Sequence, residues 1–326
     1  MVRVARRDCK HRLCIYDVCA CLFISAKPGR CTLKLEGVYT AIITPFTADG
    51  SAIDYDAFGR IVEKQIAGGV TGIVPCGTTG ESPTLSHDEH SALIERTVAM
   101  VNGRCEVLAG TGSNSTAEAV AFTQDAVRAG VDGVMLVNPY YNKPSQRGLL
   151  EHFRTVARAS GKPVVVYNIK GRTGVNVEVE TFRELLELDN VRAVKEASGD
   201  PGQMARMIGT YGDRLSLLSG DDGLTPALMA LGGRGVISVI SNLYPAKLTR
   251  MVGHYLKEEF SAGNKIYYEL LPLMNALFWD TNPVPVKWAA ARAGLCQPAL
   301  RLPLVEMDAD LQERVGSLLD QVGADA

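Results

Sequence analysis

The hydrophobic pattern of the chain repeats a two-part unit. Short runs rich in apolar and β-branched residues close at Gly, Pro, Asn or Ser, and each is followed by an amphipathic segment of helical length. Near-continuous hydrophobicity is typical of strands in a parallel sheet that helices cover on both faces. Eight such runs occur, and they span residues 39–46, 72–76, 106–110, 133–138, 163–168, 191–197, 215–220 and 235–241. The pattern predicts an α/β fold, a closed (β/α)8 TIM barrel.

Helix signals support this count. Ser86 stands three residues before Glu89 in the pattern of a capping box, and Ser115 offers a second cap. After the eighth run, helical segments over about residues 245–292 and 308–322 exceed the single helix that the barrel still needs. We therefore predict a leader at residues 1–35, a barrel at 36–244 and C-terminal helices packed on the barrel at 245–326.

Composition narrows the classes of function. With 46% hydrophobic residues, 21% charged residues and a formal net charge of -2, the chain has the balance of a folded globular protein. Nothing in that balance attracts nucleic acid. No stretch reaches the roughly 18 apolar residues of a membrane span. We expect neither a nucleic acid nor a membrane as partner.

The first 35 residues differ from the rest, because eight basic residues face only Asp8 and Asp17. A secretory signal is disfavoured since Asp17 interrupts its apolar stretch, whereas an organellar transit peptide suits the basic composition. We favour a third explanation, a disordered or wrongly assigned start. Five of the eight cysteines also lie in the first 31 positions, without zinc or disulfide spacing. We expect reduced thiols and a cytoplasmic location, with organellar targeting left open.

Lys195 is the first candidate for chemistry. Under the period of two, Val191, Ala193, Lys195 and Ala197 share one face of the sixth strand, which should face the barrel interior. Barrel enzymes place catalytic groups near the C-terminal ends of strands, and burial favours a neutral, nucleophilic amine. The alternative is a structural lysine paired with Glu196. Adjacent strand residues face opposite sides, which weakens that pairing.

Tyr167 ends the fifth strand, next to the strand of Lys195. If the Lys195 amine attacks a carbonyl group, a carbinolamine forms and then loses water. Both steps move protons, which the Tyr167 phenol can relay. The alternative is a core tyrosine whose hydroxyl is merely hydrogen-bonded.

One glycine-rich loop and one arginine supply candidate anion-binding groups. Gly77-Thr78-Thr79-Gly80-Glu81-Ser82 offers backbone N–H groups and hydroxyls that suit a small carboxylate, and it lacks the ending of a phosphate loop. Gly110-Thr111-Gly112 lacks the third glycine of a dinucleotide motif. Arg172 can clamp a carboxylate in bidentate fashion, unless it is an ordinary exposed arginine.

His87 and His90 share a helix face but lack a third ligand, so we expect no metal.

Together these residues resemble the dihydrodipicolinate synthase and N-acetylneuraminate lyase family, over roughly residues 36–322. The ordered motifs that carry the resemblance are Gly77-Thr78-Thr79-Gly80-Glu81-Ser82, Asn138-Pro139-Tyr140-Tyr141-Asn142, Tyr167-Asn168, Arg172-Thr173-Gly174, Lys195-Glu196-Ala197-Ser198-Gly199, Ser219-Gly220-Asp221-Asp222 and Gly235-Val236-Ile237-Ser238. The paired threonines, the double tyrosine and Arg172 look like the synthase branch.

The resemblance implies a lyase of lysine and diaminopimelate biosynthesis. Lys195 would form an imine with pyruvate, and the enamine would attack L-aspartate-4-semialdehyde, with no metal or organic cofactor. The alternative is another pyruvate-dependent class I aldolase or lyase of the same family. One departure from the family pattern is Lys170, which stands two residues before Arg172 where a proline is frequent.

The resemblance also implies roles for individual residues. The implied catalytic residues are Lys195, Tyr167, Thr78 and Tyr141, the last supplied by a neighbouring subunit of a homotetramer built from two tight dimers. The implied substrate-binding residues are Thr79, Gly220 and Ile237 for pyruvate and Arg172 for the semialdehyde. L-Lysine would act as feedback inhibitor at Ser82, His87, His90, Asn114, Glu118 and Tyr140.

Overall fold

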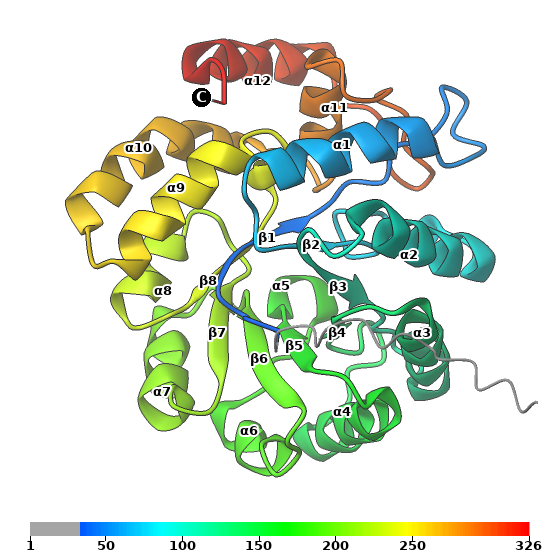
Figure 1. The fold of residues 1–326 in the computed structure, drawn as a ribbon, viewed down its shortest axis with the longest axis vertical. Helices are drawn as coiled ribbons and strands as arrows, with labels where there is room; N and C mark the ends of the chain where they lie inside the picture. The colour runs from blue at the N-terminus through cyan, green and yellow to red at the C-terminus, as the bar shows by residue number, and fades with distance from the viewer. Residues whose placement is uncertain (1–32, 326) are drawn as a thin grey trace, which may run out of the picture. The chain divides into compact units, whose positions relative to one another are not determined.

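The structure, a computed structural model, describes residues 33–325. Its parallel strands pair in chain order, and β1 also pairs with β8, so the sheet closes on itself (Figure 1). The strands are β1 (Gly37–Ala41), β2 (Gly72–Val74), β3 (Glu106–Gly110), β4 (Gly133–Val137), β5 (Val164–Asn168), β6 (Val191–Glu196), β7 (Ser216–Ser219) and β8 (Gly235–Ser238). The predicted closed barrel is confirmed. The predicted leader lies almost wholly outside the described residues.

Helices follow the strands and surround the barrel (Figure 1). They are α1 (Tyr55–Ala67), α2 (His87–Val101), α3 (Thr116–Ala129), α4 (Gln146–Ser160), α5 (Lys170–Thr173), α6 (Val179–Leu185), α7 (Pro201–Tyr211) and α8 (Thr225–Ala230), with short 3-10 turns at η1 (Ser82–Thr84) and η2 (Ile240–Asn242). Both predicted helix starts are confirmed, because Ser86 and Glu89 form a capping box and Ser115 accepts from the Glu118 N–H. Within residues 33–325, no helix is both long and apolar enough to span a membrane.

Four helices follow β8: α9 (Pro245–Leu256), α10 (Phe260–Ala276), α11 (Val284–Arg292) and α12 (Ala309–Val322). Helix α9 packs against β1 and α1, so it occupies the place of the eighth barrel helix, although the sequence grouped it with the C-terminal helices. Helices α10, α11 and α12 continue beyond it along one side of the barrel (Figure 1).

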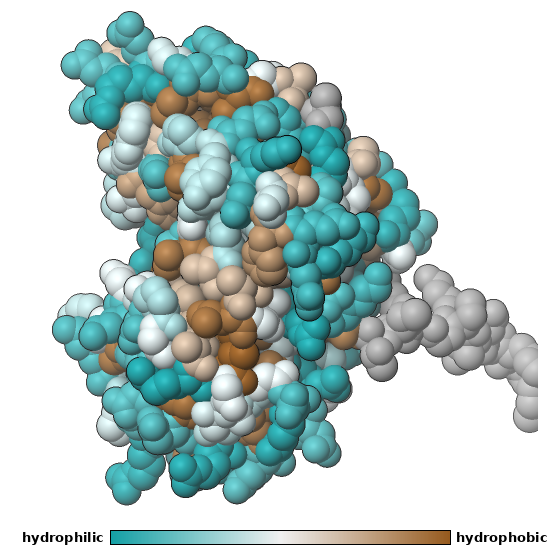
Figure 2. All heavy atoms as spheres, turned by 90° about the vertical axis from the view of Figure 1, so that its left-hand side faces the viewer, coloured by the Kyte–Doolittle hydropathy of each residue, from teal (hydrophilic) through white to brown (hydrophobic). Residues whose placement is uncertain are grey.

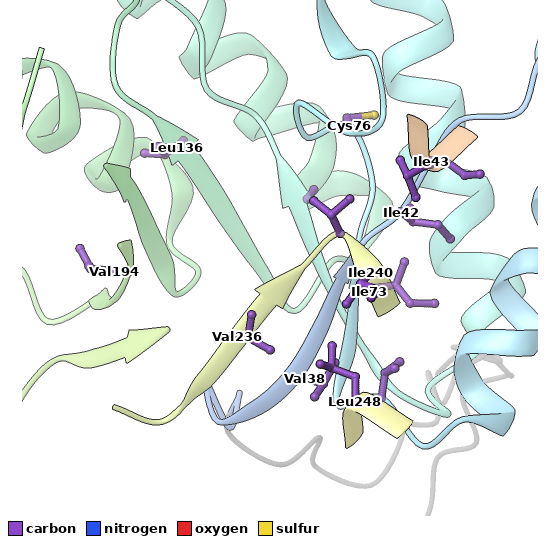
Figure 3. Packing of buried hydrophobic residues seen from close by; sticks show 14 of the residues in the cluster. Val38, Ile42, Ile43, Ile73, Cys76, Leu136, Val194, Val236, Ile240 and Leu248 are labelled. Carbon is purple, nitrogen blue, oxygen red and sulfur yellow. The ribbon is translucent and has the colours of Figure 1, made fainter. Parts of the chain in front are cut away.

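The core has two layers, which follow from the alternation of strand residues. Outward residues such as Val38, Ile73 and Val236 pack beneath the helices (Figure 3). Inward residues such as Leu108 and Leu218 fill the barrel interior together with Tyr167 at its carboxyl end. The interior is therefore a packed core rather than a pore.

One detail of β6 differs from the prediction. The pairing with β5 shifts register, so that Val191 lies opposite Val164 while Ala193 lies opposite Val165. Val191 therefore packs in the outer layer, and only Ala193 belongs to the inner one. The prediction that Val191 shares the inward face with Lys195 was wrong, because an irregularity of this kind breaks the period of two.

Candidate active site

Lys195 and Tyr167 come from neighbouring strands and meet inside the carboxyl end of the barrel. They are register partners in the β5 and β6 pairing. The Lys195 Nζ lies 4.0 Å from the centroid of the Tyr167 ring. Both side chains are buried, at 5% and 4% exposure. The structure thus brings the predicted nucleophile and the predicted phenol into direct contact.

Burial tunes the Lys195 amine. Loss of hydration lowers its pKa to about 7, the Asp222 carboxylate acts in the opposite direction, and the positive charge of Arg172 lowers it further. Near neutral pH a large fraction of the amine is therefore unprotonated. That is the form that attacks a carbonyl carbon.

Glu196 does not pair with Lys195. Its buried carboxylate accepts hydrogen bonds from the side-chain amides of Asn168 and Gln203, at 3.2 Å each, and from the Ser198 N–H at 2.7 Å. The alternative of a structural Lys195–Glu196 pair therefore has no support in the structure. Instead, the network fixes the outer face of the two strands whose inner face carries Tyr167 and Lys195.

The Tyr167 phenol is held in its protonated form. Burial raises its pKa to about 12, against the opposing effects of the Arg172 charge and a side-chain hydrogen bond with Thr78. Thr78 lies in the loop after β2, so the phenol and a hydroxyl form a connected pair. Such a pair can pass a proton to or from a group bound at Lys195.

Gly220 leaves the space that Lys195 occupies. A Cβ at this position would stand 2.7 Å from the Ala197 Cβ and 3.1 Å from the Lys195 Cε. Ile237 lies in the inner core on β8, at 1% exposure. Any larger residue at position 220 would clash with Ala197 and crowd the Lys195 side chain.

A cavity of about 380 Å³ opens above this end of the barrel. Among the predicted residues its lining includes Thr78, Tyr167 and Arg172 from the catalytic and substrate-binding sets, and Ser82, His87, Glu118 and Tyr140 from the effector set. Within residues 33–325, the predicted residues outside this lining are Lys195, Thr79, Gly220, Ile237, His90, Asn114 and Tyr141. One cavity of the single chain is therefore lined by part of each predicted residue set.

The effector set is held by its own contacts. His87 Nε2 lies 2.9 Å from Glu118 Oε1, and the Ser113 hydroxyl donates to the same carboxylate. His90 is buried beneath them, with Nε2 3.0 Å from the Gly110 carbonyl oxygen. Burial lowers the pKa of His90 to about 4, so this imidazole is neutral.

Asn114 and Tyr140 meet at the rim, where Asn114 Nδ2 donates to the Tyr140 carbonyl oxygen at 3.2 Å. Tyr141 follows with a positive φ of 72° and is 89% exposed, the highest value among the large apolar side chains of the described residues. The structure thus does not bring Tyr141 into the site of its own chain.

Two residues near the site escaped the sequence analysis. Asp222 is buried behind Lys195 and accepts from the N–H groups of Val239 and Ile240. Asn282, in the turn before α11, contacts both Thr79 and Arg172. Asp222 stood in a motif that the sequence made visible, whereas no pattern near Asn282 predicted its contacts.

The family model for the dihydrodipicolinate synthetase family matches residues 34–322. The chain belongs to this family. The 4-hydroxy-tetrahydrodipicolinate synthase of Leptospira biflexa is 52% identical over 272 residues, which cover 83% of this chain and 92% of that protein. The predicted family and its synthase branch are confirmed.

Two solved family members share the fold. The synthase of Cyanidioschyzon merolae with lysine bound is 37% identical, with a TM-score of 0.85 and coverage of 88% of this chain and 98% of that chain. The chloride-inhibited synthase of Acinetobacter baumannii complexed with pyruvate is 36% identical, with a TM-score of 0.86 and coverage of 88% and 99%. Membership of the dihydrodipicolinate synthetase family makes this chain a lyase with a barrel fold.

Proposed function

We propose that this chain condenses pyruvate with L-aspartate-4-semialdehyde, the 4-hydroxy-tetrahydrodipicolinate synthase reaction of lysine and diaminopimelate biosynthesis. One observation carries the proposal: a buried lysine whose pKa is lowered to about 7 lies against a protonated phenol. The names of the relatives supply the product, 4-hydroxy-tetrahydrodipicolinate, and the Acinetobacter baumannii enzyme was solved with pyruvate.

The chemistry follows from these two groups. The Lys195 amine attacks C2 of pyruvate, and Tyr167 with Thr78 passes a proton to the departing hydroxyl, which leaves as water. Loss of a C3 proton from the imine gives an enamine. Its C3 attacks the aldehyde carbon of the semialdehyde, whose oxygen takes up a proton. The semialdehyde's amine then adds to C2, closes the ring and releases Lys195.

Each substrate carboxylate has a candidate binding group. Thr79 is buried in the loop after β2 and offers a hydroxyl for the pyruvate carboxylate. Arg172 lines the cavity and offers its guanidinium for the semialdehyde's carboxylate. The more exposed position of Arg172 fits the substrate that arrives second.

We also propose the homotetramer of two tight dimers, with Tyr141 reaching the site of a neighbouring subunit. The 89% exposure of Tyr141 supports this, because an isolated chain leaves the phenol in solvent. Apolar side chains also gather, amid polar ones, on the face at the level of α7 and α8 (Figure 2). Leu231, directly after α8, is 41% exposed.

A cytoplasmic location stays a prediction, with organellar targeting left open.

The experiment that tests the function uses the purified chain and both substrates. Borohydride reduction in the presence of pyruvate is expected to attach one pyruvate-derived group to Lys195, located by peptide mass analysis. Addition of L-aspartate-4-semialdehyde without borohydride is expected to give the heterocyclic product. Absence of the adduct would exclude the mechanism, and an adduct without condensation would indicate a sister lyase of the family.

We further propose that L-lysine inhibits the chain at Ser82, His87, His90, Asn114, Glu118 and Tyr140, since the Cyanidioschyzon merolae relative was solved with lysine. Glu118 lines the cavity and can pair with the effector's α-ammonium. Glu118→Gln is expected to raise the half-inhibitory lysine concentration by about tenfold or more. Glu95→Gln, on the exposed side of α2, is the matched control and should leave it unchanged. Activity that millimolar lysine does not reduce contradicts the proposal.

A further inference from the structure

Asn282 touches two predicted substrate-binding residues at once. It lies between α10 and α11, far along the chain from either contact, and is 5% exposed. Its side-chain Nδ2 donates to Thr79 Oγ1 at 3.0 Å. Its backbone carbonyl oxygen accepts from Arg172 Nη2 at 3.0 Å. One residue of the C-terminal segment therefore joins the loop after β2 to the turn after β5.

The contact with Thr79 decides where that hydroxyl can donate. A threonine hydroxyl has one O–H proton and two acceptor lone pairs. Because Asn282 Nδ2 donates to Thr79 Oγ1, one lone pair is used and the O–H proton remains free. A carboxylate is a pure acceptor, so it needs that free proton. The amide of Asn282 thus keeps Thr79 as a donor.

The contact with Arg172 limits the movement of an otherwise exposed side chain. A guanidinium has five N–H donors in a planar fork, and the Asn282 carbonyl engages one of them. The others remain available for a bidentate contact with a carboxylate. Fixing one edge of the fork lowers the entropy lost when the substrate binds.

We infer that Asn282 is a positioning residue, which sets the donor direction of Thr79 and the distance between Thr79 and Arg172. The inference rests on the proposed function, because it assigns a carboxylate to each of these two groups. Its two contacts are chemically separable. The side chain donates to Thr79, the residue proposed to bind pyruvate. The backbone carbonyl accepts from Arg172, and this contact remains when the side chain is replaced.

Asn282→Asp is the sharpest variant. A carboxylate has nearly the size of the amide but only accepts, so it draws the Thr79 proton away from pyruvate. We expect the KM for pyruvate to rise about tenfold or more, with kcat and the KM for the semialdehyde changing much less. Asn282→Leu removes the donor without adding charge and should also raise the pyruvate KM. Comparison of the two variants therefore shows how much of the change in the pyruvate KM comes from the lost donor and how much from the added charge.

A double-mutant cycle with Thr79→Val tests the route of the effect. If Asn282 acts through the Thr79 hydroxyl, Asn282→Asp adds little to the pyruvate KM once that hydroxyl is absent. The matched control is Asn190→Asp, which removes donors to the Ala157 and Lys162 carbonyls at the entrance to β6 and should leave the pyruvate KM unchanged. A reduced amount of folded variant does not confuse the result, because KM is independent of enzyme concentration.

The wild type is measured first, as borohydride trapping against pyruvate concentration. If it forms no adduct, the proposed function fails and the inference fails with it. If it forms the adduct but both Asn282 variants show half-saturation within twofold of wild type, only the inference is overturned. Effects that simply add to those of Thr79→Val would overturn it as well.

Discussion

Lys195→Met is expected to reduce condensation by at least about 10⁴-fold, because the variant cannot form the imine through which the proposed reaction proceeds. Methionine has a similar length and no amine, so it fills the space beside Gly220 without leaving a cavity. Borohydride with pyruvate should then leave the protein mass unchanged. Lys195→Arg is the companion variant, since it restores a cation but not a nucleophile. Activity in either variant above about 1% of wild type contradicts the assignment.

The same lysine should govern the acid limb of the pH profile. Because its pKa is lowered to about 7, the neutral amine predominates above that pH and becomes scarcer below it. The rate of imine formation should therefore fall about tenfold per pH unit below pH 7. Borohydride trapping of the imine at a fixed pyruvate concentration, repeated over a series of pH values, measures this rate. If the rate of imine formation instead fell with a midpoint above pH 9, burial would not lower the pKa of the Lys195 amine.

Burial of the Lys195 amine should also lower the free energy of unfolding of the chain. Its pKa is about 7 in the folded state, against an ordinary value of 10.5, so the unfolded chain binds more protons between these values. Stability of the wild type relative to Lys195→Met is lowest below pH 7 and recovers as the pH rises towards 10.5. At pH 7 the variant should be more stable than the wild type in urea unfolding, and the difference should shrink as the pH rises. A destabilised variant would mean that the amine is solvated.

The sequence predicted the barrel because its strands are buried on both faces and therefore read as apolar runs. It placed several strand ends too late for the same reason. Ile42 and Ile43 follow β1 in a loop, yet both are fully buried. Hydrophobicity reports burial, and it does not distinguish a strand from the buried loop after it.

For the candidate site, the sequence predicted the position of the residues that stand on strands. Tyr167 and Lys195 are placed by their strand positions, and these survive the irregularity at Val191 because it lies before them. Contacts made across long sequence separations escaped prediction. Asn282 meets Thr79 only after the C-terminal helices pack against the barrel, so no local pattern marks it.

Lys287 provides the second large expected effect. Its sequence context gave no sign of importance, yet its side chain is fully buried, with Nζ 2.5 Å from Glu81 Oε1 and 4.0 Å from the centroid of the Phe46 ring. Burial lowers the pKa of Lys287, and the Glu81 carboxylate opposes that shift. The Lys287 and Glu81 side chains therefore form a buried ion pair.

Lys287→Met leaves the buried Glu81 carboxylate without its cation, which is expected to lower the free energy of unfolding by about 3–5 kcal/mol in urea titrations. Adding Glu81→Gln to Lys287→Met should recover much of the loss, because no buried charge then remains. Lys265→Met, at an exposed position of α10, is the matched control and should stay within about 0.5 kcal/mol of wild type.

Glu81 stands between Thr79 and Ser82, so the Lys287 pair anchors the loop that carries one residue proposed to bind pyruvate and one proposed to bind L-lysine. We therefore expect folded Lys287→Met to show a higher pyruvate KM and weaker lysine inhibition together, and Glu81→Gln to restore both in part. A variant that loses less than about 1 kcal/mol would show that this pair is not the anchor. Loss of stability with unchanged KM and inhibition would confine its role to folding.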